Sequence, residues 1–200
     1  MSMKKAWLLS VLALVCFFAS PAQASTITFG AILNGPSESP PNASPGTGTA
    51  LVTIDDIANT MRVQVTFANL VTSGTGTTAS HIHCCTPAPF SGTAGVATAT
   101  PTFPNFPLGV RSGTYDQTFG LLDAATYNPA FVTANINVAG ARAAFLAGMF
   151  ANETYLNIHS NTFGGGEIRG FLQVVPEPAT LSLLGLGLGG LVRSIRRRTT

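Results

Sequence analysis

Residues 79–89, ASHIHCCTPAP, hold two of the three histidines in the chain and two adjacent cysteines. His81 and His83 are separated by one residue, and Cys84 and Cys85 follow directly. Imidazole nitrogens and thiolates are ligands that Zn²⁺ and Cu²⁺ favour in proteins. The stretch is compatible with a metal site, a redox-active site or a hydrogen-bonded part of a sheet. The surrounding strands and helices are needed to distinguish these alternatives.

Strand periodicity can bring the third histidine to the first two. Side chains alternate between the faces of a strand, so His81 and His83 share one face. In TYLNIHS, residues 154–160, the leucine and isoleucine are typical of a core face, which places His159 on the opposite face. If the two segments join one sheet, we expect the three imidazoles to converge on a polar face.

A glycine-rich connection, SNTFGGGE, follows His159 and predicts a hairpin with the strand at 166–175. Alternation in that strand places Glu167 on the polar face. Three histidine nitrogens with Glu167 or a water as the fourth ligand suit Zn²⁺ or Cu²⁺. The alternative is a hydrogen-bonded cluster in which the histidines pair with Glu167, Asn157 and backbone carbonyls.

The adjacent cysteines have their own alternatives. An exported protein meets an oxidising compartment, which favours a disulfide over free thiols. Cys84 and Cys85 can form a vicinal disulfide, ligate a metal beside the histidines, or each pair with another chain. Nothing around them predicts an activated catalytic thiol.

Between the two terminal segments, the sequence pattern indicates short strands separated by Gly/Pro turns. Strands are predicted at residues 25–33, 51–54, 60–70, 80–84, 112–121, 154–160 and 166–175, and one short helix at 138–152. This order predicts an all-β fold, a mostly antiparallel sandwich or barrel of the immunoglobulin or superoxide-dismutase kind. Apolar helical segments are expected at both termini.

Both termini have the composition of targeting segments. The N-terminus has two lysines, an apolar run and a small-x-small site, so we predict a signal peptide at 1–24 that signal peptidase cleaves between Ala24 and Ser25. The C-terminal segment 176–200 combines a Pro-Glu-Pro, a 14-residue apolar run and an arginine cluster: Pro176, Glu177, Pro178, Arg196, Arg197 and Arg198. That run is shorter than the roughly 20 residues of a full membrane span.

This tail resembles the PEP-CTERM sorting signal. The resemblance implies a Gram-negative bacterium, transient insertion in the inner membrane and processing by an exosortase-type enzyme near the Pro-Glu-Pro. It also implies a destination at the cell surface or in the extracellular matrix.

Residues 25–175 are acidic once these ends are set aside. They carry four arginines and seven acidic residues, a net charge of −3, because six of the ten basic residues lie in the terminal segments. There is no basic stripe, so we expect no nucleic acid partner. The length, about 150 residues, predicts one domain.

Two separated motifs, ASHIHCCTPAPFSGTAGVA and ETYLNIHSNTFGGGEIRGFLQ, resemble the CHRD domain, named for chordin. The matching positions are His81, His83, Tyr155, Asn157, His159, Gly166, Glu167, Ile168, Arg169 and Gly170. Where the family often has Gly-Pro after the second histidine, this chain has two cysteines. The resemblance spans roughly residues 27–174 and implies a β-rich extracellular domain, with no established reaction to carry over.

Catalytic signatures such as a nucleophile elbow, a His-Glu-x-x-His motif or a phosphate-binding loop are absent from the sequence. Three histidines are also too few for the ligand set of copper/zinc superoxide dismutase. We therefore expect a structural or binding role in the extracellular or biofilm matrix, with a polysaccharide or a matrix protein as partner. The alternative is a metal-binding protein or metalloenzyme that uses His81, His83 and His159.

Overall fold

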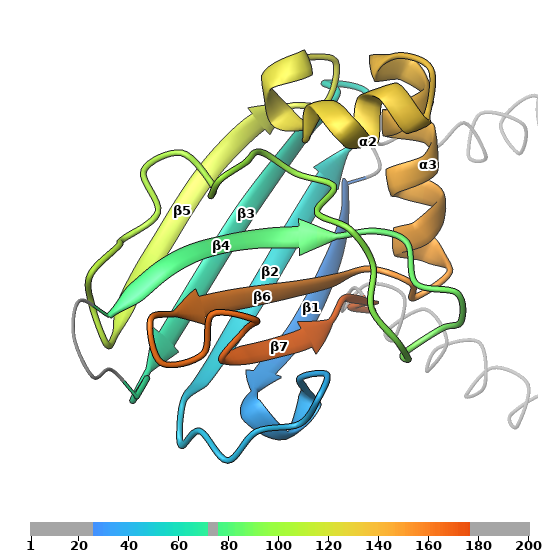
Figure 1. Cartoon of the computed structure of the whole chain (residues 1–200). Coiled ribbons are helices and arrows are strands. Elements are labelled where there is room, and N and C mark those ends of the chain that lie inside the picture. Colours follow the sequence, from blue (N-terminus) through green and yellow to red (C-terminus); the bar gives the residue numbers. More distant parts are fainter. Residues whose placement is uncertain (1–25, 72–75, 177–200) are drawn as a thin grey trace, which may run out of the picture.

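The computed structural model describes residues 26–71 and 76–176, which form one curled antiparallel sheet with two α-helices (Figure 1). In the sheet the strands follow the order β4-β6-β7-β1-β2-β3-β5, and β8 pairs with β1. The predicted all-β, mostly antiparallel fold is confirmed, in the form of a half-barrel. The strands are β1 (Thr26–Asn34), β2 (Thr47–Asp55), β3 (Thr60–Ala68), β4 (Thr77–His83), β5 (Gly113–Gly120), β6 (Tyr155–Ser160), β7 (Ile168–Phe171) and β8 (Gln173–Val174).

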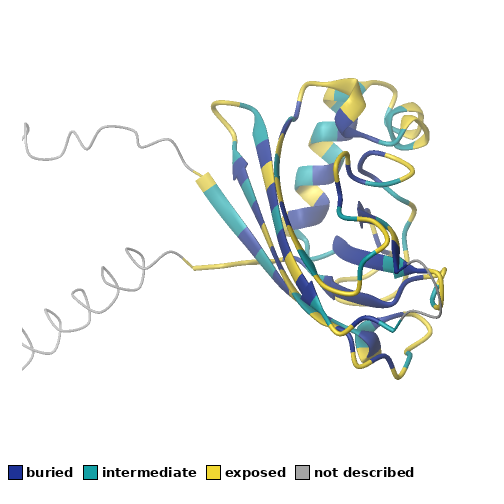
Figure 2. Ribbon diagram, turned by 90° about the vertical axis from the view of Figure 1, so that its left-hand side faces the viewer, coloured by how far each residue is buried: buried dark blue, intermediate teal, exposed yellow. Residues whose placement is uncertain are grey.

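Strands β1, β2, β3 and β5 form a regular half of the sheet in which burial follows the sequence. Every second residue of β3 is buried against the core: Met61, Val63, Val65 and Phe67. The residues between them are half-buried or exposed, and Figure 2 shows the same alternation on neighbouring strands. This half therefore has one apolar face and one wet face, as strand periodicity predicts.

Two helices lie together at one end of the half-barrel (Figure 1). The longer, α3 (Val138–Phe150), matches the predicted helix; the Asn137 side chain caps it by accepting a hydrogen bond from Gly140 N. The shorter, α2 (Pro129–Ala134), is an additional helix with Asn128 as its cap and proline at its first position. Its six residues are too few for a helical period to appear in the sequence.

The other half of the sheet joins β4 to the predicted hairpin of β6 and β7, which is distant from β4 in sequence. β4 pairs with β6, and β6 pairs with β7. The free edge of β4 is covered by residues 94–103, because Ala97 N donates to Ile82 O and Phe103 N donates to Ser80 O. Five of the six residues of β6 are buried, so both faces of this strand are covered.

Candidate metal centre

The three histidines meet on one face of the β4–β6 pair. His81 lies opposite Asn157 and His83 opposite Tyr155, while His159 lies opposite Ala79, two residues further along the ladder. Each histidine offers one nitrogen, and these three atoms all lie within 4.8 Å of one another. The His81 ring centroid is 5.4 Å from that of His83 and 4.9 Å from that of His159. The three imidazoles therefore lie close together on one face, as strand alternation predicts.

Each imidazole directs one ring nitrogen at a backbone carbonyl. His81 Nε2 is 3.0 Å from Pro101 O, His83 Nδ1 is 2.8 Å from Ala94 O, and His159 Nδ1 is 2.9 Å from Gly164 O. A carbonyl oxygen only accepts, so each of these nitrogens carries the proton that is donated. In a neutral ring the other nitrogen is then unprotonated and has a free lone pair.

Two of these unprotonated nitrogens, His81 Nδ1 and His159 Nε2, are buried and have no hydrogen-bond partner in the described part of the chain. The third, His83 Nε2, lies 3.1 Å from Asn157 Oδ1. Ala94 O and Asn157 Oδ1 can both be satisfied only by a doubly protonated His83. A neutral His83 keeps the bond to Ala94 O, and its Nε2 accepts instead from the Asn157 NH₂ group once the amide turns over.

The electrostatics favour the neutral rings. Burial, followed by the charges of His159 and His83, lowers the pKa of His81 to about 4, opposed by hydrogen bonds with Pro101 and Asn157. Burial also lowers the pKa of His83 and of His159, opposed by the hydrogen bonds that these rings donate to Ala94 O and Gly164 O. At neutral pH the face therefore presents unprotonated nitrogens.

A buried cation supports the cluster from the side of β7. The Arg169 guanidinium lies 4.7 Å from the centroid of the Tyr155 ring, and that ring stacks on His83 at 4.6 Å. Arg169 donates to Ser37 O and Gly92 O, and its Nε is 3.8 Å from Glu38 Oε2. Burial raises the pKa of Glu38 to about 7 even though Arg169 lowers it.

Glu167 belongs to a different set of contacts. It lies just before β7 and is fully buried, and one carboxylate oxygen accepts hydrogen bonds from Ser44 Oγ and Val71 N. Among the described residues, the group of converging metal-ligand atoms holds the three histidines and does not include Glu167. The structure thus brings together three of the four residues proposed as ligands.

Cys84 and Cys85 are joined by a disulfide at the end of β4. The bridge packs on α3 at Gly148, where an added Cβ would lie 2.3 Å from Cys85 Sγ and 2.7 Å from Cys84 Sγ. Glycine is required at this helix position because no side chain fits between the helix and the two sulfurs. The cysteines are likewise outside the group of converging ligand atoms.

Glu38 and Gly148 were not identified from the sequence. Glu38 lies in GPSESPPNASPGTG, which reads as a solvated loop, yet it is only 6% exposed because the segment folds back on β7. Its one signal is that it is the only charged residue in that stretch. Gly148 is one of two glycines inside α3, and a glycine in a helix interior signals a close contact.

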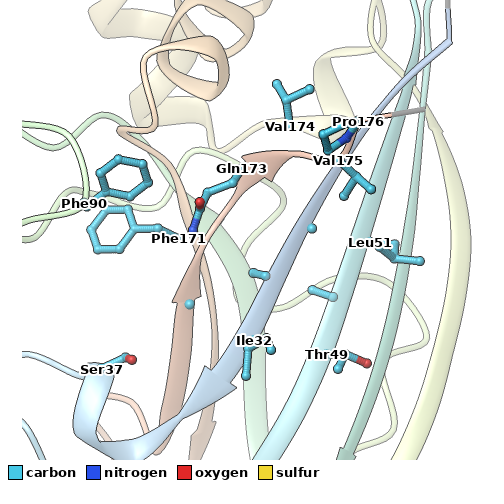
Figure 3. A pocket seen from close by; sticks show the side chains of 14 residues that line it. Ile32, Ser37, Thr49, Leu51, Phe90, Phe171, Gln173, Val174, Val175 and Pro176 are labelled. Atoms are coloured by element: carbon cyan, nitrogen blue, oxygen red, sulfur yellow. The ribbon is translucent and has the colours of Figure 1, made fainter. Parts of the chain in front are cut away.

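An open groove of about 600 Å³ lies on the outer side of β1, β2 and β8 (Figure 3). Most of its side chains are apolar and several are well exposed, among them Ile32, Leu51, Val174 and Val175. Phe90 closes one end against Phe171, with the ring centroids 6.1 Å apart. Pro176, the first residue of the predicted sorting segment, also lines the groove.

The other predicted sorting and cleavage residues lie outside the described part of the chain: Ala24, Ser25, Glu177, Pro178, Arg196, Arg197 and Arg198. The apolar segments predicted at both termini lie there too. In residues 26–71 and 76–176, no helix is long and apolar enough to span a membrane.

Two families match the chain. The CHRD domain matches residues 29–172, and the PEP-CTERM protein-sorting motif matches residues 174–198. Comparisons with curated proteins and with solved structures found no match. The first match covers most of the chain and contains both histidine-bearing strands; the second implies export, exosortase processing and surface sorting. The chain therefore belongs to the CHRD-domain family and carries a PEP-CTERM sorting motif.

Proposed function

We propose that this protein is displayed at the cell surface as a structural or binding module of the extracellular or biofilm matrix. The observation that carries the proposal is the direct succession of the two matches, with the sorting motif starting two residues after the CHRD domain ends. The tail therefore directs the sorting of the CHRD domain that precedes it. In this account the chain divides into a signal peptide (1–24), the domain (25–175) and a tail (176–200) that inserts transiently in the inner membrane.

The groove beside Pro176 is the surface that we assign to the matrix contact. Exposed apolar patches of this kind mark interaction sites. Its lining offers few hydrogen-bonding side chains, among them Ser37, Thr49 and Gln173. That chemistry suits an apolar segment of a matrix protein better than a polysaccharide, whose recognition needs many hydrogen bonds.

Deletion of residues 176–200 tests the sorting half of the proposal. In a Gram-negative host with an exosortase, we expect the truncated protein to be exported but lost from the surface and matrix fractions. A chain with Arg193, Arg196, Arg197 and Arg198 changed to alanine should lose its retention in the inner membrane and escape processing, because no arginine then holds its end in the cytoplasm. Normal surface display of the truncated protein would contradict the assignment.

An Ile32→Asp substitution tests the binding half. Ile32 is 73% exposed within the groove, whereas Ile57 is 71% exposed in the turn between β2 and β3. We expect Ile32→Asp to reduce retention in the matrix fraction at least several-fold and the matched Ile57→Asp control to leave it unchanged. Equal retention of both variants would show that the groove does not bind the matrix.

A further inference from the structure

We propose that His81, His83 and His159 bind one Zn²⁺ or Cu²⁺ ion, with His81 Nδ1, His159 Nε2 and His83 Nε2 as the ligand atoms. This site goes beyond the matrix role and does not depend on it. It follows from the directions of the ring nitrogens, from two unsatisfied buried atoms and from the convergence of the three rings.

The tautomers are already those of a metal site. A metal-ligating histidine usually donates its other N–H to a carbonyl or carboxylate, which fixes the ring and keeps the ligand nitrogen unprotonated. Here Pro101 O, Gly164 O and Ala94 O each accept such a bond from one imidazole. In a neutral triad the three remaining nitrogens are unprotonated, and among the described residues those of His81 and His159 have no hydrogen-bond partner.

The unsatisfied atoms call for a partner. Buried polar atoms in folded proteins are nearly always hydrogen-bonded, and a buried one without a partner is destabilising. His81 Nδ1 and His159 Nε2 both lack a partner although they belong to neighbouring rings. The two rings cannot satisfy each other, because each has donated its only proton to a carbonyl. One cation between them satisfies both.

Distance and access agree with a metal. In a tetrahedral site with metal–nitrogen bonds of about 2.0–2.1 Å, the ligand nitrogens lie roughly 3.4 Å apart. One nitrogen from each of the three rings lies within 4.8 Å of the other two, so a shift of the side chains brings the rings to this spacing. His81 and His83 are buried while His159 is half-exposed, so an ion reaches the cluster from the side of His159.

The ligand chemistry selects the class of ion. Three neutral imidazoles without a carboxylate suit Zn²⁺ and Cu²⁺, whereas Ca²⁺ and Mg²⁺ require oxygen ligands. The Glu167 carboxylate is held by Ser44 and Val71, so we assign the fourth position to a water. The hydrogen bond between Asn157 and His83 must open for the third ligand to bind.

The test uses the full chain, purified without a histidine tag and stripped with a chelator. These three are the only histidines of the chain, so every imidazole effect reports on this cluster. After loading with Zn²⁺ or Cu²⁺ separately and gel filtration, we expect one ion per chain and a rise in Tm. A His159→Gln variant loses a ligand and should bind the ion more than about 100-fold more weakly. Loss of a residue that only hydrogen-bonds a ligand costs about 10–100-fold.

Two matched controls separate the histidines from other donors. Glu167→Gln and the Cys84→Ser/Cys85→Ser double variant should keep the stoichiometry of the unmodified chain. Binding that survives in His159→Gln but disappears in the cysteine variant would assign the ion to thiolates and overturn the proposal. No bound ion at micromolar concentrations of either metal would leave the histidines as a hydrogen-bonded cluster and would also overturn it.

A measurement on the unmodified chain protects the test against variants that fail to fold. Nitrogen-15 NMR of the imidazoles in the metal-free protein should show His81 protonated at Nε2 and His159 protonated at Nδ1. Addition of Zn²⁺ should shift the opposite nitrogen of each ring, since that nitrogen becomes the ligand. Unchanged ring nitrogens in the presence of excess Zn²⁺, and again in the presence of excess Cu²⁺, would refute the site without any substitution.

Discussion

The two halves of the sheet carry their charges in opposite ways. In the regular half, Arg62 and Asp116 form a cross-strand ion pair with side chains 52% and 48% exposed. In the half that holds the histidines, Arg169 and Glu38 face each other with side chains 6% and 5% exposed. The first pair is solvated and replaceable, whereas the second is desolvated and surrounded by fixed backbone carbonyls.

The half that holds the histidines departs from simple strand patterning. β3 has a core face and a wet face, while β6 is covered on both faces and its second face is polar. A polar face that is buried has to satisfy each of its donors and acceptors. Among the described residues, His81 Nδ1 and His159 Nε2 are two of the buried polar atoms without a hydrogen-bond partner, and they are the two that we assign to a ligand.

The largest effect is expected for Arg169→Met. The substitution leaves Ser37 O and Gly92 O without their donor and Glu38 without its cation. Breaking a buried pair in this way costs about 3–5 kcal/mol. Urea unfolding of the metal-free chain measures the loss. A loss as small as that of an exposed pair would show that the β4–β6–β7 half is more solvated than its burial indicates.

A pH-dependent effect follows for Glu38→Gln. The pKa of Glu38 is raised from 4.5 to about 7, chiefly by burial, so the folded state holds a proton that the unfolded state has released. The stability from this proton is complete below pH 4.5 and is lost as pH rises through 7, by up to about 3 kcal/mol. Glutamine cannot ionise and removes this loss.

Unfolding free energies at pH 5 and pH 8 check that prediction. From pH 5 to pH 8 the unmodified chain should lose stability relative to Glu38→Gln. Because the histidines contribute equally to the pH dependence of both proteins, the difference isolates Glu38. A difference that stays constant with pH would mean that Glu38 titrates normally.

A smaller effect is expected for Gly148→Ala, which places a methyl group against the sulfurs of Cys84 and Cys85. Overpacking of this kind costs about 1–3 kcal/mol, more than alanine gains in helix propensity. Gly165→Ala is the matched control, because a Cβ there meets nothing within 4 Å. Thermal unfolding of the oxidised protein compares the two. If Gly148→Ala proves as stable as its control, α3 does not pack on the disulfide.

The smallest effect is expected for Arg62→Met, the exposed counterpart of Arg169→Met. Because solvent and salt screen the Arg62–Asp116 pair, the loss should be several-fold smaller than that of the buried substitution. Unfolding at low and high salt should show that the small remaining difference fades as ionic strength rises. Equal losses for the two arginine variants would erase the contrast between the halves.

Sequence patterns predict this structure where local periodicity controls it. The alternation in TMRVQVTFANL predicts the buried face of β3, and the same rule predicts that His81, His83 and His159 share a face. Periodicity does not reveal the carbonyls of Ala94 and Pro101, because residues 84–112 have no repeating pattern and are positioned by contacts with β4. The burial of Glu38 likewise depends on how a loop folds over β7, which no local signal encodes.

X-ray absorption at the metal edge of the loaded full chain identifies the atoms that bind the ion. We expect three imidazole nitrogens at about 2.0–2.1 Å and one further light-atom ligand. A sulfur shell at about 2.3 Å, or an oxygen shell without imidazole, would show that the ion binds elsewhere and that the buried histidine face is not a metal centre.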